Sequence, residues 1–243
     1  MILPLKKDNV IDQYFNSMFA QPLAVLLLDN SIFLISISMT EKQEKPVGNK
    51  GAWAKRFMAA AIVQGAIISG LTIFLVLGQI SVIKPEISRV IAAGGAGTWF
   101  TLGFVMYIIV GVTGVAVSSL FYHYLENVVE KPIKRSGRAL AWAHLILMNV
   151  GTVTAMALMM YAGYIGSASM LPEDVGGKGL NAGQAHELLA PFVEPIGAAI
   201  LVIVTGVIAG GIGFLASYRS SLSSNPSELI SSGRSSKKDS NVV

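Results

Sequence analysis

The sequence has no cysteine and little charge. Without cysteine, disulfide bonds, thiolate metal sites and catalysis by a thiol are all excluded. Charged residues make up 13% of the 243 residues and hydrophobic residues make up 53%. A soluble domain carries roughly 25% charged residues, so this composition indicates a membrane protein. Only three histidines are present, His123, His144 and His186.

The formal net charge of +4 raises the question of nucleic-acid binding. The basic residues do not form a patch or a stripe, however, but stand in short groups beside apolar runs. This distribution is typical of membrane topology signals and not of a nucleic-acid-binding face. We therefore expect the lipid bilayer, and not nucleic acid, as a partner.

Four apolar runs predict membrane-spanning helices at about residues 57–83, 98–123, 139–166 and 191–218. Lys84-Pro85-Glu86 ends the first run, and a short linker that can form a helix follows. The second and third runs flank a short charged connection, Glu126 to Arg138, and must therefore be antiparallel neighbours. Together the four runs predict an all-α fold, an integral membrane four-helix bundle.

The basic residues predict the orientation of this bundle. They precede the first span, fill the loop between the second and third, and follow the fourth: Lys42, Lys45, Lys50, Lys55 and Arg56; Lys131, Lys134, Arg135 and Arg138; Arg219, Arg234, Lys237 and Lys238. The other two loops together carry fewer cations than carboxylates: Lys84, Arg89 and Lys178 against Glu86, Glu173, Asp174, Glu187 and Glu194. By the positive-inside rule, both termini are cytoplasmic in a multi-pass protein of the cell membrane.

The two ends of the chain fall outside the predicted membrane domain, residues 57–218. Residues 1–38 contain two apolar stretches that Asp29-Asn30 interrupts. They are either an over-extended start before Met39, an extra membrane-associated helix, or a signal or anchor. Residues 39–56 predict a polar cytoplasmic segment. The Ser-rich tail, 219–243, has few aliphatic residues with which to build a core, so we expect it to be disordered.

The hairpin from Gly97 to Gly166 has a recognisable pattern. Its first helix has an early Trp and Gly and an aromatic-rich end, and its second helix opens with Leu-Ala-x-x-His. In this pattern it resembles the late helices of the haem-copper oxidase catalytic subunit, in the branch of the cbb3-type oxidases and nitric oxide reductases. The matching positions are Leu140, Ala141, His144, Gly151 and Gly163.

The departures from that family bear on the chemistry. The resemblance implies haem, but the family's haem-ligand histidines have no counterpart in the stretch from Gly94 to Gly103. No His-Pro-Glu or paired-histidine motif occurs, and the chain is far shorter than a catalytic subunit. We therefore expect a truncated relative that lacks the metal ligands, has no catalytic centre of its own and carries no cofactor.

Two histidines within the predicted spans are the candidate haem ligands if haem is bound. His123 ends the second span and His144 lies about two turns into the third, on the same side of the membrane. The alternative for His123 is an interfacial residue of the aromatic belt, and for His144 a buried hydrogen bond between helices. Four methionines of the third span could suggest copper(I), but methionine is equally a packing residue: Met148, Met156, Met159 and Met160.

Small and polar residues predict where the helices pack. Glycines at one face let helices approach closely, and an amide inside a span must find a hydrogen-bond partner. Gln64 in the first span either bonds a neighbouring helix or lies at the interface with the headgroups. The packing candidates of the other spans are Gly103, Gly111 and Gly114 in the second, Asn149 in the third, and Gly206 and Gly210 in the fourth.

The longest connection, residues 167–190, contains Gly176, Gly177 and Gly179 and could dock a partner. Asn181 is placed to cap a short helix over 181–189. From all these features we expect a non-catalytic accessory or structural subunit of a membrane redox complex of the terminal-oxidase type, bound to other membrane subunits. The alternatives are a small haem-binding membrane cytochrome and an auxiliary subunit of a copper membrane monooxygenase.

Overall fold

The computed structural model describes residues 51–81, 84–130, 133 and 135–222. The described residues belong to one compact unit. The predictions for residues 1–38 and for the tail beyond residue 222 fall outside the described residues.

The described residues are helical and contain no strand, which confirms the all-α prediction for this part of the chain. The first long helix is α3 (Ala52–Ser81), and the short α4 (Ile87–Ala92) fills the linker. The second is continuous in four parts: α5 (Gly95–Met106), η2 (Tyr107–Gly114), α6 (Val115–His123) and η3 (Tyr124–Val128). The others are α7 (Arg135–Met170) and α8 (Ala182–Leu222), with the single turn η4 (Glu173–Val175) between them.

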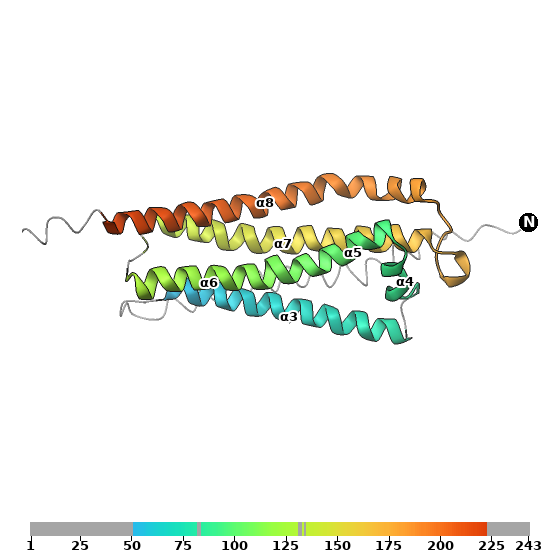
Figure 1. The fold of residues 1–243 in the computed structure, drawn as a ribbon, viewed down its shortest axis with the longest axis horizontal. Helices are drawn as coiled ribbons and strands as arrows, with labels where there is room; N and C mark the ends of the chain where they lie inside the picture. The colour runs from blue at the N-terminus through green and yellow to red at the C-terminus, as the bar shows by residue number, and fades with distance from the viewer. Residues whose placement is uncertain (1–50, 82–83, 131–132, 134, 223–243) are drawn as a thin grey trace, which may run out of the picture. The chain divides into compact units, whose positions relative to one another are not determined.

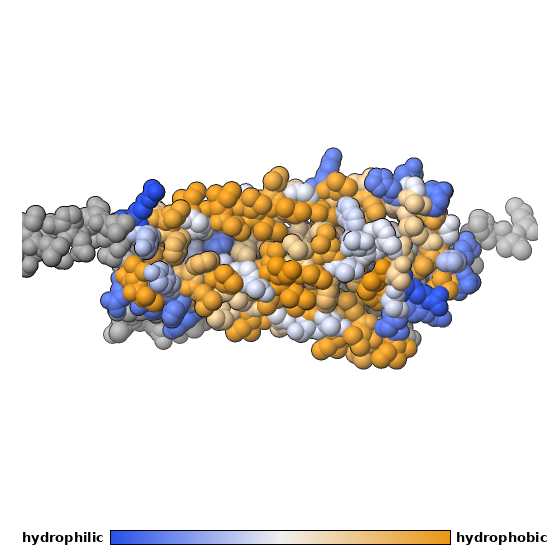
Figure 2. All heavy atoms as spheres, in the orientation of Figure 1, coloured by the Kyte–Doolittle hydropathy of each residue, from blue (hydrophilic) through white to orange (hydrophobic). Residues whose placement is uncertain are grey.

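Four of these segments are long and apolar enough to cross a membrane, as predicted: Ala52–Ile80, Gly95–Val128, Ser136–Met170 and Ala182–Arg219. At 1.5 Å per residue, α7 is about 54 Å long and α8 about 61 Å, so both exceed a hydrocarbon core of about 30 Å. In Figure 2 the visible face is apolar over its middle and hydrophilic toward its two ends. The chain is therefore a multi-pass helical membrane protein.

The contacts between the long helices follow the order of the chain. α3 packs mainly on α6 and η2, α5 packs on α7, and α7 packs along α8. Figure 1 shows this order from bottom to top, with α3 and α8 as the outer helices of the four. Within its most apolar stretch α7 is 61% buried, against 28% in each of the other three segments. α7 is thus the central helix, and α3 and α8 are edge helices.

Glycines allow the second long helix and α8 to approach α7. A methyl group added at Gly103 would lie 3.0 Å from the carbonyl oxygen of Met156, and one at Gly114 would lie 2.9 Å from Met148 Cε. On the α8 side, a methyl group at Gly206 would lie 2.9 Å from the Met148 nitrogen. All five glycines predicted for packing lie against α7, and so face the same helix.

The start of α8 differs from the expected boundary. The predicted short helix and the fourth span are one continuous helix, and Pro191 and Pro195 lie inside it and not in its first turn. The predicted cap is confirmed. Asn181 Oδ1 accepts the Gln184 N–H at 3.0 Å, and Gln184 Oε1 accepts the Asn181 N–H at 3.1 Å. This reciprocal pair satisfies free donors at the helix start and adds about three turns before Pro191.

Gly163 gives a direct test of the close packing of α7. A methyl group there would overlap the backbone nitrogen of Phe100 and lie 2.8 Å from its Cα, and backbone atoms cannot rotate away. We predict that Gly163→Ala lowers stability by about 1–3 kcal/mol, the usual cost of overpacking. Thermal unfolding in mild detergent, followed by circular dichroism, measures it.

The matched control is Gly197→Ala on α8, where no atom lies within 4 Å of the added methyl group. Because alanine favours helix over glycine, this change should leave the melting temperature unchanged or slightly raised. Equal melting temperatures for the two variants would mean that α5 and α7 do not touch at Gly163.

Candidate functional site

Three polar side chains meet between α3, η2 and α7. Gln64 Nε2 donates to Asn149 Oδ1 at 2.9 Å, and the Tyr107 hydroxyl donates to Gln64 Oε1. Asn149 Nδ2 also donates to the carbonyl oxygen of Leu145 at 2.7 Å. All three side chains are buried, and Gln64 is only 1% exposed. We call Gln64, Tyr107 and Asn149 the polar triad.

The polar triad lies well inside its helices. Gln64 is twelve residues after the start of α3, about 18 Å along the helix axis. In hydrocarbon an unpaired polar group costs several kcal/mol, so the two hydrogen bonds of Gln64, with Asn149 and with Tyr107, hold α3 to its neighbouring helices. Of the two alternatives for Gln64, the structure shows the bond to a neighbouring helix and not contact with headgroups.

The second long helix widens where it contributes Tyr107. Residues Tyr107–Gly114 form a π-helix, which has more residues per turn than an α-helix. This segment brings Tyr107 to Gln64 and sets Gly111 against Thr152, whose Cγ2 would lie 3.2 Å from an added methyl group. The Thr152 hydroxyl is fully buried and has no hydrogen-bond partner within the described part of the chain.

An aromatic cluster lies near the start of α3. Phe57 stacks on Tyr122 at a centroid distance of 4.7 Å, and Trp53 meets the edge of Trp142 at 5.4 Å. The His144 ring lies 4.9 Å from that of Phe57, and its Nδ1 is 3.4 Å from the Tyr122 hydroxyl oxygen. The cluster joins α3 to the second long helix and to the start of α7.

The start of α3 is capped by a residue far along the chain. Glu126 accepts backbone N–H groups of Trp53 at 3.1 Å and of Ala54 at 3.2 Å. A helix start has free N–H donors and a partial positive charge, so a carboxylate is the favoured partner there. Beside it, the Arg56 guanidinium carbon lies 4.5 Å from the Trp53 ring centre and 5.0 Å from that of Trp142.

The structure places the two candidate haem ligands in different surroundings. His144 is buried within the aromatic cluster, and a methyl group added at Gly210 of α8 would overlap its ring. His123 is exposed, and its Nδ1 lies 3.0 Å from Asn127 Nδ2. The third histidine, His186, is exposed on α8. Among the described residues, no three or more His, Cys, Asp or Glu residues gather as a metal site.

The four methionines considered as copper ligands, all in α7, are buried: Met148, Met156, Met159 and Met160. Met148 lies against Gly114, and Met159 and Met160 lie against Gly103. Their flexible side chains fill the space that the glycines leave, which is the usual packing role of methionine.

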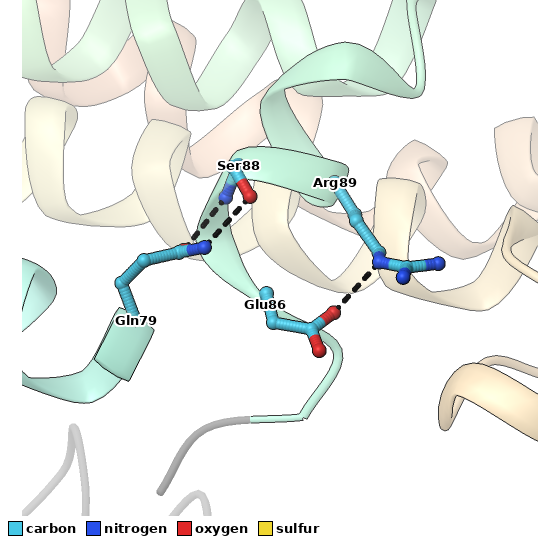
Figure 3. A network of polar contacts seen from close by, with 4 residues as sticks. All are labelled: Gln79, Glu86, Ser88 and Arg89. Atoms are coloured by element: carbon cyan, nitrogen blue, oxygen red, sulfur yellow. Dashed lines mark hydrogen bonds and ion pairs between the residues drawn. The ribbon is translucent and has the colours of Figure 1, made fainter. Parts of the chain in front are cut away.

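At the opposite end of the bundle, polar contacts hold the linker (Figure 3). Gln79 Nε2 donates to Ser88 Oγ at 2.7 Å, and Gln79 Oε1 accepts the Ser88 N–H at 3.0 Å. Glu86 forms an ion pair with Arg89 at 2.9 Å. These contacts tie the end of α3 to α4, but they are exposed and should contribute little stability.

The comparisons with known proteins gave no match. No protein-family model, curated protein or solved structure matches the chain.

Two participants in these contacts were not identified from the sequence. Tyr107 lies in mid-span, and its hydroxyl was a usable signal because a buried tyrosine normally finds a partner. Glu126 was taken as part of a polar connection, and nothing in the sequence pairs it with Trp53, which is 73 residues away.

The polar triad predicts a specific mutational effect. Tyr107→Phe removes the donor to Gln64 Oε1 and leaves that oxygen unpaired in the bilayer interior. We predict a loss of about 1–2 kcal/mol, the range seen for hydrogen bonds between membrane helices. Unfolding in detergent measures it, with Tyr124→Phe as control because Tyr124 is exposed.

A double-mutant cycle separates this bond from a general packing effect. In a Gln64→Leu background the acceptor is already absent, so Tyr107→Phe should cost much less than in the native chain. The same cost in both backgrounds would show that Tyr107 does not bond Gln64.

The surroundings of His144 predict the absorption spectrum of the purified protein. Because the ring is packed among Phe57, Tyr122 and Gly210, we predict no Soret band and no pyridine haemochrome signal. Stoichiometric haem that disappears in His144→Ala but persists in His123→Ala would contradict this prediction. Loss of haem in both variants would support the bis-histidine cytochrome instead.

Proposed function

We propose that the chain is a non-catalytic accessory or structural subunit of a membrane redox complex of the terminal-oxidase type. The resemblance of residues 97–166 to oxidase helices supports the class of complex. The absence of histidine from residues 94–103 of the sequence supports a role without its own haem or copper centre.

The arrangement of the helices is the observation that carries this proposal. The oxidase-like hairpin lies between α3 and α8, and these two edge helices make at most marginal contact with each other. Both keep long uncovered apolar faces, which include Ile62, Phe74 and Leu77 on α3 and Leu201, Ile208 and Leu215 on α8. Such faces suit lipid or the helices of another subunit.

The distribution of charge supports an orientation. One end of the bundle, which we call the basic end, is formed by the starts of α3 and α7 and the ends of η3 and α8. Its described cations are Lys55, Arg56, Arg138 and Arg219, and its carboxylates are Glu126 and Glu130. The opposite end has Lys84, Arg89 and Lys178 with Glu86, Glu173, Asp174, Glu187 and Glu194. By the positive-inside rule, the basic end faces the cytoplasm.

The two alternatives remain hypotheses from the sequence. A small cytochrome would need haem at His144 and His123, and the spectrum described above tests it. The hypothesis of an auxiliary subunit of a copper monooxygenase is tested by identifying the partner subunits.

Because the chain has no native cysteine, single cysteines can map the partner surface. We would place one at Leu201, which is 66% exposed on α8, attach a photoreactive crosslinker in native membranes and identify the adducts by mass spectrometry. We predict adducts with subunits of a redox complex. Ile203, which is only 8% exposed on the same helix, is the matched control.

The outcome decides between partners and lipid. Crosslinks from Ile62→Cys and Leu201→Cys to redox subunits, absent from Ile203→Cys, would support the proposal. A chain that forms no protein adduct from either exposed site, and that purifies alone from native membranes, would contradict it.

A further inference from the structure

Aromatic side chains of different helices gather at two levels along the bundle. Near the basic end, the Trp53 ring of α3 lies 6.2 Å from that of Tyr122 and 5.4 Å from that of Trp142 in α7, between centroids. Phe121, which precedes Tyr122, meets the edge of Phe214 of α8 at 6.0 Å. These five rings come from all four long helices, and we call them the basic-end girdle.

A second level of rings lies toward the other end of the bundle. Tyr161 of α7 meets the edge of Phe192 of α8 at a centroid distance of 5.5 Å. Trp99 of α5 and Phe192 both pack against one small buried cluster, which includes Ala162 of α7. We call Trp99, Tyr161 and Phe192 the opposite girdle, and it joins three of the four long helices.

The spacing of the girdles corresponds to the thickness of a bilayer core. In α8, Phe192 and Phe214 are 22 residues apart, and no residue between them is aromatic. In α7, Trp142 and Tyr161 are 19 residues apart, again with no aromatic residue between them. At 1.5 Å per residue these separations are about 33 Å and about 29 Å, against a hydrocarbon core of about 30 Å.

The charged side chains follow the same two levels. Between the girdles, the described parts of the long helices carry only three Lys, Arg, Asp or Glu residues: Lys55, Arg56 and Glu194. Each of these is within three residues of a girdle ring, Trp53 or Phe192, and can extend its charged group toward water. The zone between the girdles is therefore suited to hydrocarbon, where charge is costly.

We propose that each girdle lies at one of the two headgroup interfaces, with the hydrocarbon core between them. Tryptophan and tyrosine are enriched at this depth because their rings are apolar on the body and polar at one edge. Phe121 is exposed, and Trp99, Trp142, Phe192 and Phe214 are half-buried, so these rings can contact the glycerol and carbonyl layer of the phospholipids.

This placement has a consequence for α8. Ala182 is ten residues before Phe192, so the first part of the helix extends about 15 Å beyond the interface at the opposite girdle. That extension carries the exposed side chains of His186 and Glu187 and lies outside the hydrocarbon core. The placement holds whether or not the chain has a redox partner.

Spin labels on single cysteines of this cysteine-free chain test the placement. Val193, Val204 and Leu215 are spaced 11 residues apart on one side of α8, where they are 51%, 45% and 57% exposed. Val193 and Leu215 each adjoin a girdle ring, and Val204 lies midway. The purified full chain would be reconstituted into dioleoylphosphatidylcholine vesicles. Electron paramagnetic resonance with oxygen and with a water-soluble nickel chelate then gives the depth of each label.

We expect the label at Val204→Cys to lie near the bilayer centre. Those at Val193→Cys and Leu215→Cys should lie about 16 Å shallower, at equal depths. Glu187→Cys is the matched reference on the same helix and should be as open to the nickel chelate as a site in water. Circular dichroism verifies that each labelled variant is folded.

Two results would overturn the proposal. A depth that changes steadily from Val193 to Leu215 would mean that an interface lies away from its girdle. A label at Glu187 that the nickel chelate does not reach would place the start of α8 within the hydrocarbon.

Discussion

The hydrogen bond between Gln64 and Asn149 is the contact on which the position of α3 depends. A glutamine inside a membrane helix must find a partner, and this one is 1% exposed and bonded to both neighbouring helices. Apolar contacts alone give only a weak preference for one register between membrane helices, because the same apolar side chains pack equally well against lipid tails. The polar triad therefore fixes both the rotation and the height of α3 against the hairpin.

A second constraint acts at the start of α3. There the Glu126 carboxylate accepts the free backbone N–H groups of the helix start, and Arg56 packs on two tryptophan rings. The triad and the cap hold α3 at two heights, about 16 Å apart along the axis from Trp53 to Gln64. α8 is held differently. Gly206 and Gly210 let it approach α7 so closely that Met148 and His144 fill the available space.

These two modes of attachment explain why the fold is a series of neighbours in chain order. α7 takes the second long helix on one side and α8 on another through its own glycines, Gly163 and Gly151, whose added methyl groups would strike Phe100 and Ile203. α3 and α8 consequently keep large uncovered apolar faces. Lipid, and in the proposed complex a partner subunit, would complete the burial of these helices.

Much of the fold was predictable, because a chain that crosses the hydrocarbon core must form long apolar helices. Four long apolar runs and the cap at Asn181 were read correctly, since both depend on local sequence. The start of α8 was not predicted correctly. Pro191 and Pro195 suggested that the helix begins there, but this membrane helix tolerates both prolines in its interior. The pairing of Gln64 with Asn149 and Tyr107, and of Glu126 with α3, depends on how distant helices are rotated, which no local pattern encodes.

The direct test of the central claim, that four helices cross the bilayer with the polar triad in its interior, is the sidedness of the two ends. Single cysteines at Lys55 and Lys178 of the cysteine-free chain would be labelled with a membrane-impermeant thiol reagent in sealed vesicles of known orientation. We predict that vesicles of one orientation expose only one of the two sites, and that inverted vesicles expose only the other. Labelling of both sites from the same side would contradict an odd number of crossings between them, and with it the four-helix membrane arrangement.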